Sequence, residues 1–354
     1  MRDQDPVERF RQKMARRRYL PRPPRRRSGT TTKLAVFALI VIITAGMVLE
    51  LRGRAEEVAL VEYARANATP PIDLIVNAGR AHRLLFLGDV PGAAAPKRLA
   101  ADVIDTLATT YGLDAVVLDV DAREQPWIDR YLESRPEDAS ILLARPRALK
   151  EAEGTSSAML EVYRRVWAVN ERLGPDRRVR IIAADLPDWP PEGTVSLGEA
   201  VQRFGRRDSH FVTTVESRLL ERNRRARVLF FVDGLHVLKG SAEAVTGGTP
   251  PARIVFAAGQ FERAYPNETY SILVDAPAAR ALSAQVARFL STAAAEVLRE
   301  SDVAGSSFAL PVAEELQPGS DPIRTISRPG ITFEITPPRY RLVDLIDAYI
   351  YLVN

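Results

Sequence analysis

Aspartate residues stand at the ends of four apolar, strand-like segments of the sequence. In an open sheet of parallel strands, ligands bind outside the carboxyl ends of the strands, so side chains at these ends are the first candidates for chemistry. Carboxylates that cluster there can bind a cation, or can raise one another's pKa and so supply a general acid and a general base. An aspartate after a strand can also simply cap the next turn or helix. Because aspartate recurs at the ends of four strands, a functional site remains an alternative to capping. The residues are Asp89, Asp119, Asp121, Asp185 and Asp233.

The sequence holds three histidines, and one of them comes shortly after a strand-end aspartate. His236 follows Asp233, and an imidazole titrates near neutral pH, which suits proton transfer. A partly buried histidine with satisfied hydrogen bonds is the alternative interpretation. His210 is expected at a helix start, where capping explains the segment, and His82 is expected at the surface. The candidate catalytic residues are Asp89, Asp119 and His236.

The elements that must position these side chains alternate between strand-like and helix-like segments. Apolar, β-type runs predict strands at 83–87, 115–120, 180–184, 227–232, 253–257 and 270–274. Apolar residues at helical spacing predict helices at 96–111, 157–173, 208–223 and 277–300. Residues 302–340 are expected to be rich in loops, and 342–352 to add a last strand. This alternation predicts an α/β fold with a mainly parallel central sheet flanked by helices.

An uninterrupted apolar stretch at residues 34–49 precedes this domain. With its flanking residues the stretch approaches the roughly 20 residues that cross a bilayer, so it predicts one transmembrane helix at 34–51. A cleavable signal peptide and a buried core helix are the alternatives. The first 33 residues hold 12 Arg or Lys against 3 acids, and by the positive-inside rule this basic tail is cytoplasmic.

Four regions follow from these patterns. A disordered basic tail at 1–33, the transmembrane helix at 34–51, a stalk or linker at 52–80 and an α/β domain at 81–354 are expected in that order. The tail is expected to face anionic lipid of the inner leaflet. The chain is therefore expected to be a single-pass protein of the inner (cytoplasmic) membrane, with an uncleaved signal anchor and a periplasmic or extracellular domain.

Charge and composition exclude several classes of function. The tail carries +9 while the whole chain carries +4, which leaves −5 after Lys33. The domain thus lacks the net basic character that nucleic-acid binding requires. The sequence has no cysteine, which excludes disulfides, Cys-based zinc sites and thiol nucleophiles. Walker A, His-Glu-x-x-His, Gly-x-Ser-x-Gly and Gly-x-Gly-x-x-Gly patterns are also absent.

Several segments resemble motifs of the superfamily that joins ChaN-like haem-binding lipoproteins, Tiki proteases and erythromycin esterases. The resemblance runs from about Leu84 to Leu352. Segments 85–89, 116–119 and 345–352 are similar to the opening, second and closing strands of that superfamily. Segments 207–211 and 231–236 are similar to a helix and a histidine-bearing turn of the bacterial ChaN-like branch. The most specific match is Asp185-Leu186-Pro187-Asp188-Trp189, which is similar to the Asp-Pro-Pro-x-Asp-Trp segment of the same branch.

The sequence departs from the superfamily pattern at two carboxylates and one histidine. Asp89 stands where the resemblance implies glutamate, and Val90-Pro91-Gly92-Ala93 follows in place of a histidine. Asp119 stands where the second strand usually ends in glutamate. Because the histidine acts as a base or metal ligand in hydrolytic members, its loss favours an altered active site.

The resemblance and these departures are compatible with two functions. The first is a ligand-binding or scaffold module, a pseudoenzyme for a small-molecule or peptide ligand. The second is a hydrolase, either an esterase or a metal-dependent peptidase, that uses the candidate catalytic residues. Haem and a divalent metal are cofactors implied by the resemblance alone, and the oligomeric state is left open. The expected ligand-binding residues are Asp121, Asp185, Asp188, Trp189, His210 and Asp233.

Overall fold

The computed structural model describes residues 50, 55, 58–90, 92–144, 157–187, 189, 197–246, 249–276, 298–300, 306–313, 325–328, 331–336 and 341–353. The chain divides into two units, Met1–Arg54 and Ala55–Asn354. The predicted transmembrane helix at 34–51 lies outside the described residues, apart from Glu50. Within the described ranges, no helix has the length and apolar character that a bilayer crossing requires.

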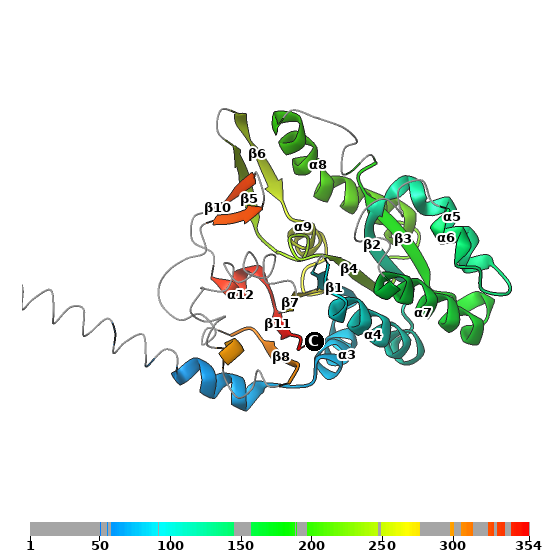
Figure 1. Ribbon diagram of the computed structural model, residues 1–354, viewed down its shortest axis with the longest axis horizontal. Helices are drawn as coiled ribbons and strands as arrows, with labels where there is room; N and C mark the ends of the chain where they lie inside the picture. The colour runs from blue at the N-terminus through cyan, green and yellow to red at the C-terminus, as the bar shows by residue number, and fades with distance from the viewer. Residues whose placement is uncertain are drawn as a thin grey trace, which may run out of the picture. The chain divides into compact units, whose positions relative to one another are not determined.

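The second unit is built on a seven-stranded sheet with the order β3-β2-β4-β1-β7-β11-β8 (Figure 1). Every neighbouring pair is parallel except β11 and β8, which are antiparallel. This arrangement confirms the predicted α/β fold with a mainly parallel sheet. The strands are β1 Leu84–Asp89, β2 Ala115–Asp121, β3 Arg180–Asp185, β4 Val228–Asp233, β7 Thr269–Asp275, β8 Phe308–Pro311 and β11 Ala348–Tyr351.

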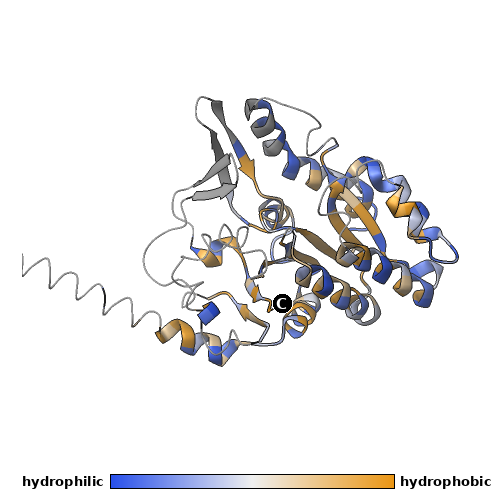
Figure 2. Ribbon diagram, viewed as in Figure 1, coloured by the Kyte–Doolittle hydropathy of each residue, from blue (hydrophilic) through white to orange (hydrophobic). Residues whose placement is uncertain are grey.

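Helices cover both faces of this sheet because its strands are apolar on both sides. Along β1, Leu84 and Phe86 belong to one buried cluster, which includes residues of α8 and α9. Leu85 and Leu87 belong to a second cluster, which includes residues of α3, α4, α5 and α7. Figure 2 shows apolar strands beside helices that carry both apolar and hydrophilic residues. This burial on both faces is typical of parallel strands.

From α4 onward, the described helices lie in the connections between strands, whereas α3 and a helix at 58–67 precede β1. Gly112, which ends α4, has a φ of 73°, a left-handed conformation that favours glycine at a helix C-terminus. The helix at 58–67 buries Leu60 and Ala64 in the first cluster. The other helices are α3 Pro71–Ala81, α4 Ala95–Tyr111, α5 Gln125–Glu133, α6 Ser140–Leu143, α7 Ser157–Leu173, α8 Leu197–Val215, α9 Ala257–Ala264 and α12 Leu342–Leu345, with single turns at Ala122–Glu124, Pro175–Arg177 and Glu216–Leu220.

Three sequence predictions of elements were wrong. Residues 253–257 do not join the parallel sheet, because β6 pairs antiparallel with β5 in a separate four-stranded sheet of order β6-β5-β10-β9. Two of its strands lie within 302–340, which was expected to be rich in loops. Residues 342–352 form α12 and then β11 instead of one strand. The strands of the second sheet are β5 Ser241–Thr246, β6 Thr249–Val255, β9 Thr325–Arg328 and β10 Ile331–Thr336.

The helix predicted at 208–223 begins much earlier, at Leu197. Asp208 was taken as part of a capping segment, but its carboxylate instead accepts a hydrogen bond from the backbone N–H of Ala257 at 2.8 Å. His210 consequently lies within the helix and not at its start. Of the helix predicted at 277–300, only 298–300 lie among the described residues, and these are helical.

Candidate functional site

The strand-end aspartates meet at one edge of the sheet, as the parallel fold predicts. In the strand register, Asp89 of β1 lies beside Asp233 of β4. Asp121 of β2 lies beside Asp185 of β3. Asp119, two residues before the end of β2, accepts a hydrogen bond from the backbone N–H of Asp233 at 3.0 Å. The carboxyl ends of four neighbouring strands therefore present an acidic edge.

Lys97 of α4 neutralises Asp89 within this edge. Its ammonium group lies 2.9 Å from Oδ1 and 2.8 Å from Oδ2 of Asp89. It also donates to the carbonyl oxygens of Val90 at 3.4 Å and Ala93 at 3.1 Å. The Lys97 side chain is 2% exposed and that of Asp89 is 14% exposed. A buried lysine is held here by the carboxylate and by the turn that follows β1.

The environment of Asp89 raises its pKa despite this partner. Burial raises the pKa of Asp89 to about 6, Lys97 opposes the rise, and the charges of Asp119 and Asp233 add to it. Burial likewise raises the pKa of Asp119, against the opposing charge of His236. Both carboxyls thus move toward the pH range in which a side chain can exchange protons at neutral pH.

A second buried ion pair joins β3 to α8. Arg207 donates through Nε to Oδ1 of Asp185 at 2.9 Å and through Nη2 to Oδ2. Its guanidinium lies over the ring of Trp189, 4.7 Å from the ring centroid. The bidentate geometry and the stacked ring are typical of a fixed arginine–carboxylate pair. Asp185 and Trp189 are therefore brought together by Arg207, whereas the predicted ligand residue Asp188 lies outside the described residues.

A third buried pair links His236 to Asp208 of α8. Nδ1 of His236 lies 2.7 Å from Oδ1 of Asp208, and each side chain is 2% exposed. The imidazole stacks on Phe211, with ring centroids 5.7 Å apart. Burial disfavours the charged imidazole, but the charge and hydrogen bond of Asp208 outweigh it, so the pKa of His236 is raised. Nε2 of His236 is buried and has no hydrogen-bond partner among the residues that the structure describes.

The remaining predicted ligand residues have local roles. Asp121 caps the turn at Ala122–Glu124 by accepting from the backbone N–H of Arg123 at 2.9 Å, and it pairs with the Arg123 guanidinium at 2.7 Å. Asp233 accepts from the backbone N–H of Leu235 at 2.9 Å, which shapes the turn that carries His236. Nε2 of His210 lies 3.3 Å from Oγ1 of Thr214. Partial burial lowers the pKa of His210.

Sequence reasoning missed Lys97 and Asp208 as members of this edge. It also missed Asp275, which ends β7 next to β1 and is fully buried. Oδ2 of Asp275 accepts hydrogen bonds from Tyr349 at 2.9 Å and from Nε of Arg299 at 3.1 Å. The run of apolar residues before Asp275 is the same signal that marked the other strand-end aspartates, so this residue was accessible to sequence analysis.

The donor set does not suit the cofactors that the family resemblance implied. No group of three His, Asp or Glu side chains in the described ranges is arranged to hold a metal ion. Lys97 and Arg207 already occupy the carboxylates of Asp89 and Asp185. The His236 ring is 1% exposed, so a group as large as haem could reach its Nε2 only if the surrounding residues moved apart. The described residues therefore do not fit a resident metal ion or haem.

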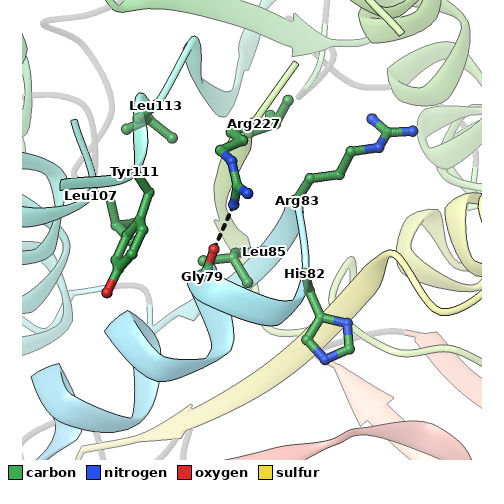
Figure 3. A pocket seen from close by; sticks show the side chains of 9 residues that line it. Gly79, His82, Arg83, Leu85, Leu107, Tyr111, Leu113 and Arg227 are labelled. Carbon is green, nitrogen blue, oxygen red and sulfur yellow. Dashed lines mark hydrogen bonds between the residues drawn. The ribbon is translucent and has the colours of Figure 1, made fainter. Parts of the chain in front are cut away.

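A small surface pocket lies at the opposite end of the sheet, near the starts of β1 and β4 (Figure 3). Its floor is apolar, and Nη1 of Arg227 donates to the carbonyl of Gly79 at 2.6 Å. His82 is one of its lining residues, and Nδ1 of His82 lies 3.1 Å from the carbonyl oxygen of Asn267. This pocket contains none of the strand-end carboxylates. Its lining residues are Gly79, His82, Arg83, Leu85, Leu107, Tyr111, Leu113, Arg227 and Val228.

Comparison with known proteins places the fold. No protein-family model matches the sequence, and no curated protein matches it. Among solved structures, a histidine-to-asparagine mutant of erythromycin esterase EreC in its open conformation is similar, with 10% identity and a TM-score of 0.50 over 79% of this chain and 92% of that one. A Bacillus cereus protein is similar with 11% identity and a TM-score of 0.50, over 84% and 97% of the two chains. A succinoglycan biosynthesis protein reaches 9% identity and a TM-score of 0.49, over 83% and 96% of the two chains.

The domain therefore has an erythromycin esterase-like α/β fold. Identities of about 10% show the fold alone.

Proposed function

We propose that this protein is a membrane-anchored ligand-binding or scaffold module of the ChaN-like type, with an altered active site at the strand ends. The observation that supports this most is the buried pair of Lys97 and Asp89. It stands at the end of β1, where the resemblance implies a glutamate followed by a histidine. At the altered first motif, the structure thus has the ammonium group of Lys97 beside Asp89, where the resemblance implies a histidine base.

The pairing leaves little reactivity at Asp89. An ammonium group has three protons, and Lys97 has four acceptor oxygens within 3.4 Å, so none of its protons is left for a ligand. Both oxygens of Asp89 contact that ammonium group. Metal binding or proton abstraction by Asp89 requires the pair to separate, and separating a buried ion pair is strongly unfavourable.

Hydrolysis is the second candidate, and the pair of Asp208 and His236 favours it. A carboxylate on Nδ1 holds an imidazole in the tautomer that leaves Nε2 free to accept a proton. Asp119, whose pKa is raised, interacts electrostatically with His236. These two groups supply a base and an acid for the cleavage of an ester or a peptide without any contribution from Asp89.

Turnover by the purified full chain separates the two candidates. We expect the wild type to hydrolyse a panel of p-nitrophenyl esters and fluorogenic peptides no faster than its Asp89→Ala and His236→Gln variants. His82→Gln is the matched control, because it makes the same substitution at the opposite end of the sheet. Activity that falls at least 100-fold in His236→Gln and persists in His82→Gln would reject the binding-only function.

The anchor belongs to the same proposal and rests on the sequence. The apolar stretch at residues 34–49 and the +9 tail support a single-pass inner-membrane protein with its domain in the periplasm or outside the cell. Fractionation should recover the full chain with the membranes and release it only with detergent. Recovery in the soluble fraction at high salt would reject the anchor.

A further inference from the structure

We propose that Asp208 is a positioning residue, which fixes the ring of His236 so that Nε2 is the atom that meets a ligand or substrate at the strand ends. This inference rests on the proposed site, and it holds for a binding function as well as for hydrolysis. Asp208 lies on α8, far from the strand-end motifs in sequence. Among the described residues, its side chain bonds to His236 and to the backbone N–H of Ala257, so it is distinct from the candidate catalytic residues.

Two donors from different elements converge on one oxygen of Asp208. Oδ1 accepts from the backbone N–H of Ala257 at 2.8 Å and contacts Nδ1 of His236 at 2.7 Å. Ala257 begins α9, and the N-terminus of a helix stabilises negative charge. An aspartate carboxylate oxygen accepts hydrogen bonds, and this one already accepts from the backbone N–H of Ala257. It follows that Nδ1 of His236 carries a proton.

The backbone around His236 is fixed by the same helix. The N–H of Ala258 donates to the carbonyl of His236 at 3.0 Å, and the N–H of His236 donates to the carbonyl of Asp233 at 2.9 Å. Phe211, which follows Asp208 on α8, stacks on the imidazole at an interplanar angle of 7°. These contacts fix the backbone, the ring plane and Nδ1 of His236. They therefore oppose a flip of the ring that would exchange the positions of Nδ1 and Nε2.

Nε2 of His236 is buried, and within the described part of the chain it has no hydrogen-bond partner. Leaving a buried polar atom unpaired is energetically unfavourable. Such a cost is usual where an atom has a function. The charges that act on the ring besides Asp208 are Arg207 on α8 and Asp119 on β2. Asp119 lies at the strand-end edge, which connects the ring with the proposed site.

Nuclear magnetic resonance of the histidines tests this role without a ligand or an assay. The full chain has only three histidines, so ¹⁵N-histidine labelling in detergent micelles gives three imidazoles, which His82→Gln and His210→Gln assign. We expect neutral His236 to carry its proton on Nδ1. In Asp208→Asn, which keeps the shape and removes the charge, the titration midpoint of His236 should fall by at least about one pH unit.

Asp121→Asn is the matched control, since Asp121 ends β2 at the same edge and pairs with Arg123. It should leave the His236 midpoint within about 0.3 pH units, because the contact with Asp208 persists. A proton on Nε2 of the wild type would overturn the proposal, and so would an unchanged midpoint in Asp208→Asn. If Asp208→Asn does not fold, the position of the proton on neutral His236 in the wild type still tests the proposal. Neither result depends on turnover, so a failure of this proposal can be distinguished from a failure of the proposed function.

Discussion

Replacing Lys97 by Met should lower the free energy of unfolding by about 3 kcal/mol at pH 8, because removal of one partner leaves a buried charge uncompensated. The Lys97 side chain is 2% exposed, and it contacts both oxygens of Asp89. Methionine matches the stem of the lysine, so the apolar packing of α4 is retained. The loss is placed at the low end of the range for buried pairs because Asp89 keeps 14% of its side-chain surface exposed. Denaturant unfolding of the full chain in micelles measures it.

The loss should depend on pH in a defined direction. Burial already raises the folded-state pKa of Asp89 from 3.8 to about 6, and without Lys97 the pKa rises further. A carboxyl whose pKa is raised by folding binds its proton more tightly in the folded state, so its contribution to stability falls as pH increases from about 4 through 6 and above. The deficit of Lys97→Met should therefore shrink between pH 8 and pH 5.

The double variant Asp89→Asn/Lys97→Met is the control for this pair. Removing both charges should recover most of the lost stability, since a buried ion pair and a neutral replacement are often of similar stability. A single variant as stable as the wild type at pH 8 would show that the pair is not buried as described. A double variant less stable than the single one would show that the loss has another cause.

Gly259→Ala should destabilise the protein by about 3 kcal/mol, since added atoms in a packed interior force backbone shifts. A Cβ at this position would overlap the backbone carbonyl of Lys239. Gly259 lies in α9, and its N–H donates to the carbonyl of Leu238 at 3.2 Å. The helix and the turn after His236 are therefore in direct backbone contact. Thermal unfolding should show the loss, and the His236 resonances should shift in any folded fraction.

Gly79→Ala is the matched substitution within another helix. A Cβ there would lie 2.8 Å from Cδ2 of Leu107, the end of a flexible side chain. Alanine also gains about 1 kcal/mol of helix propensity over glycine, so the net change should stay within about 1 kcal/mol. Equal losses for the two variants would contradict the backbone contact between α9 and the turn at 234–240.

The parallel part of the fold could be predicted from local sequence patterns. β1, β2, β3 and β4 are runs of apolar residues, and α4 and α7 show the spacing of a helix with one buried face. The second sheet could not be predicted in the same way. β5 pairs with β6, which is close in sequence, and with β10, which is not. No local pattern marks such distant antiparallel partners.

In the candidate site, too, one part could be predicted from local sequence and another part could not. The meeting of Asp89 with Asp233 follows from the parallel order of β1 and β4, so strand ends alone predict it. The cations that pair with Asp89 and Asp185 come from helices α4 and α8, and their burial depends on packing. Lys97 has the sequence pattern of an ordinary helix lysine, and Asp208 that of a capping residue. Which cation neutralises which acid is therefore a tertiary property that residue order does not reveal.

Calorimetric titration of the full chain with Zn²⁺ and Mn²⁺ is the most direct test of whether groups of the protein itself already occupy the strand-end carboxylates and so prevent metal binding. The wild type should give the same binding heat as its Asp89→Asn and Asp119→Asn variants, because Lys97 and the backbone N–H of Asp233 already occupy those carboxylates. One equivalent of metal bound by the wild type, and lost in either variant, would contradict the account and favour a metal-dependent hydrolase.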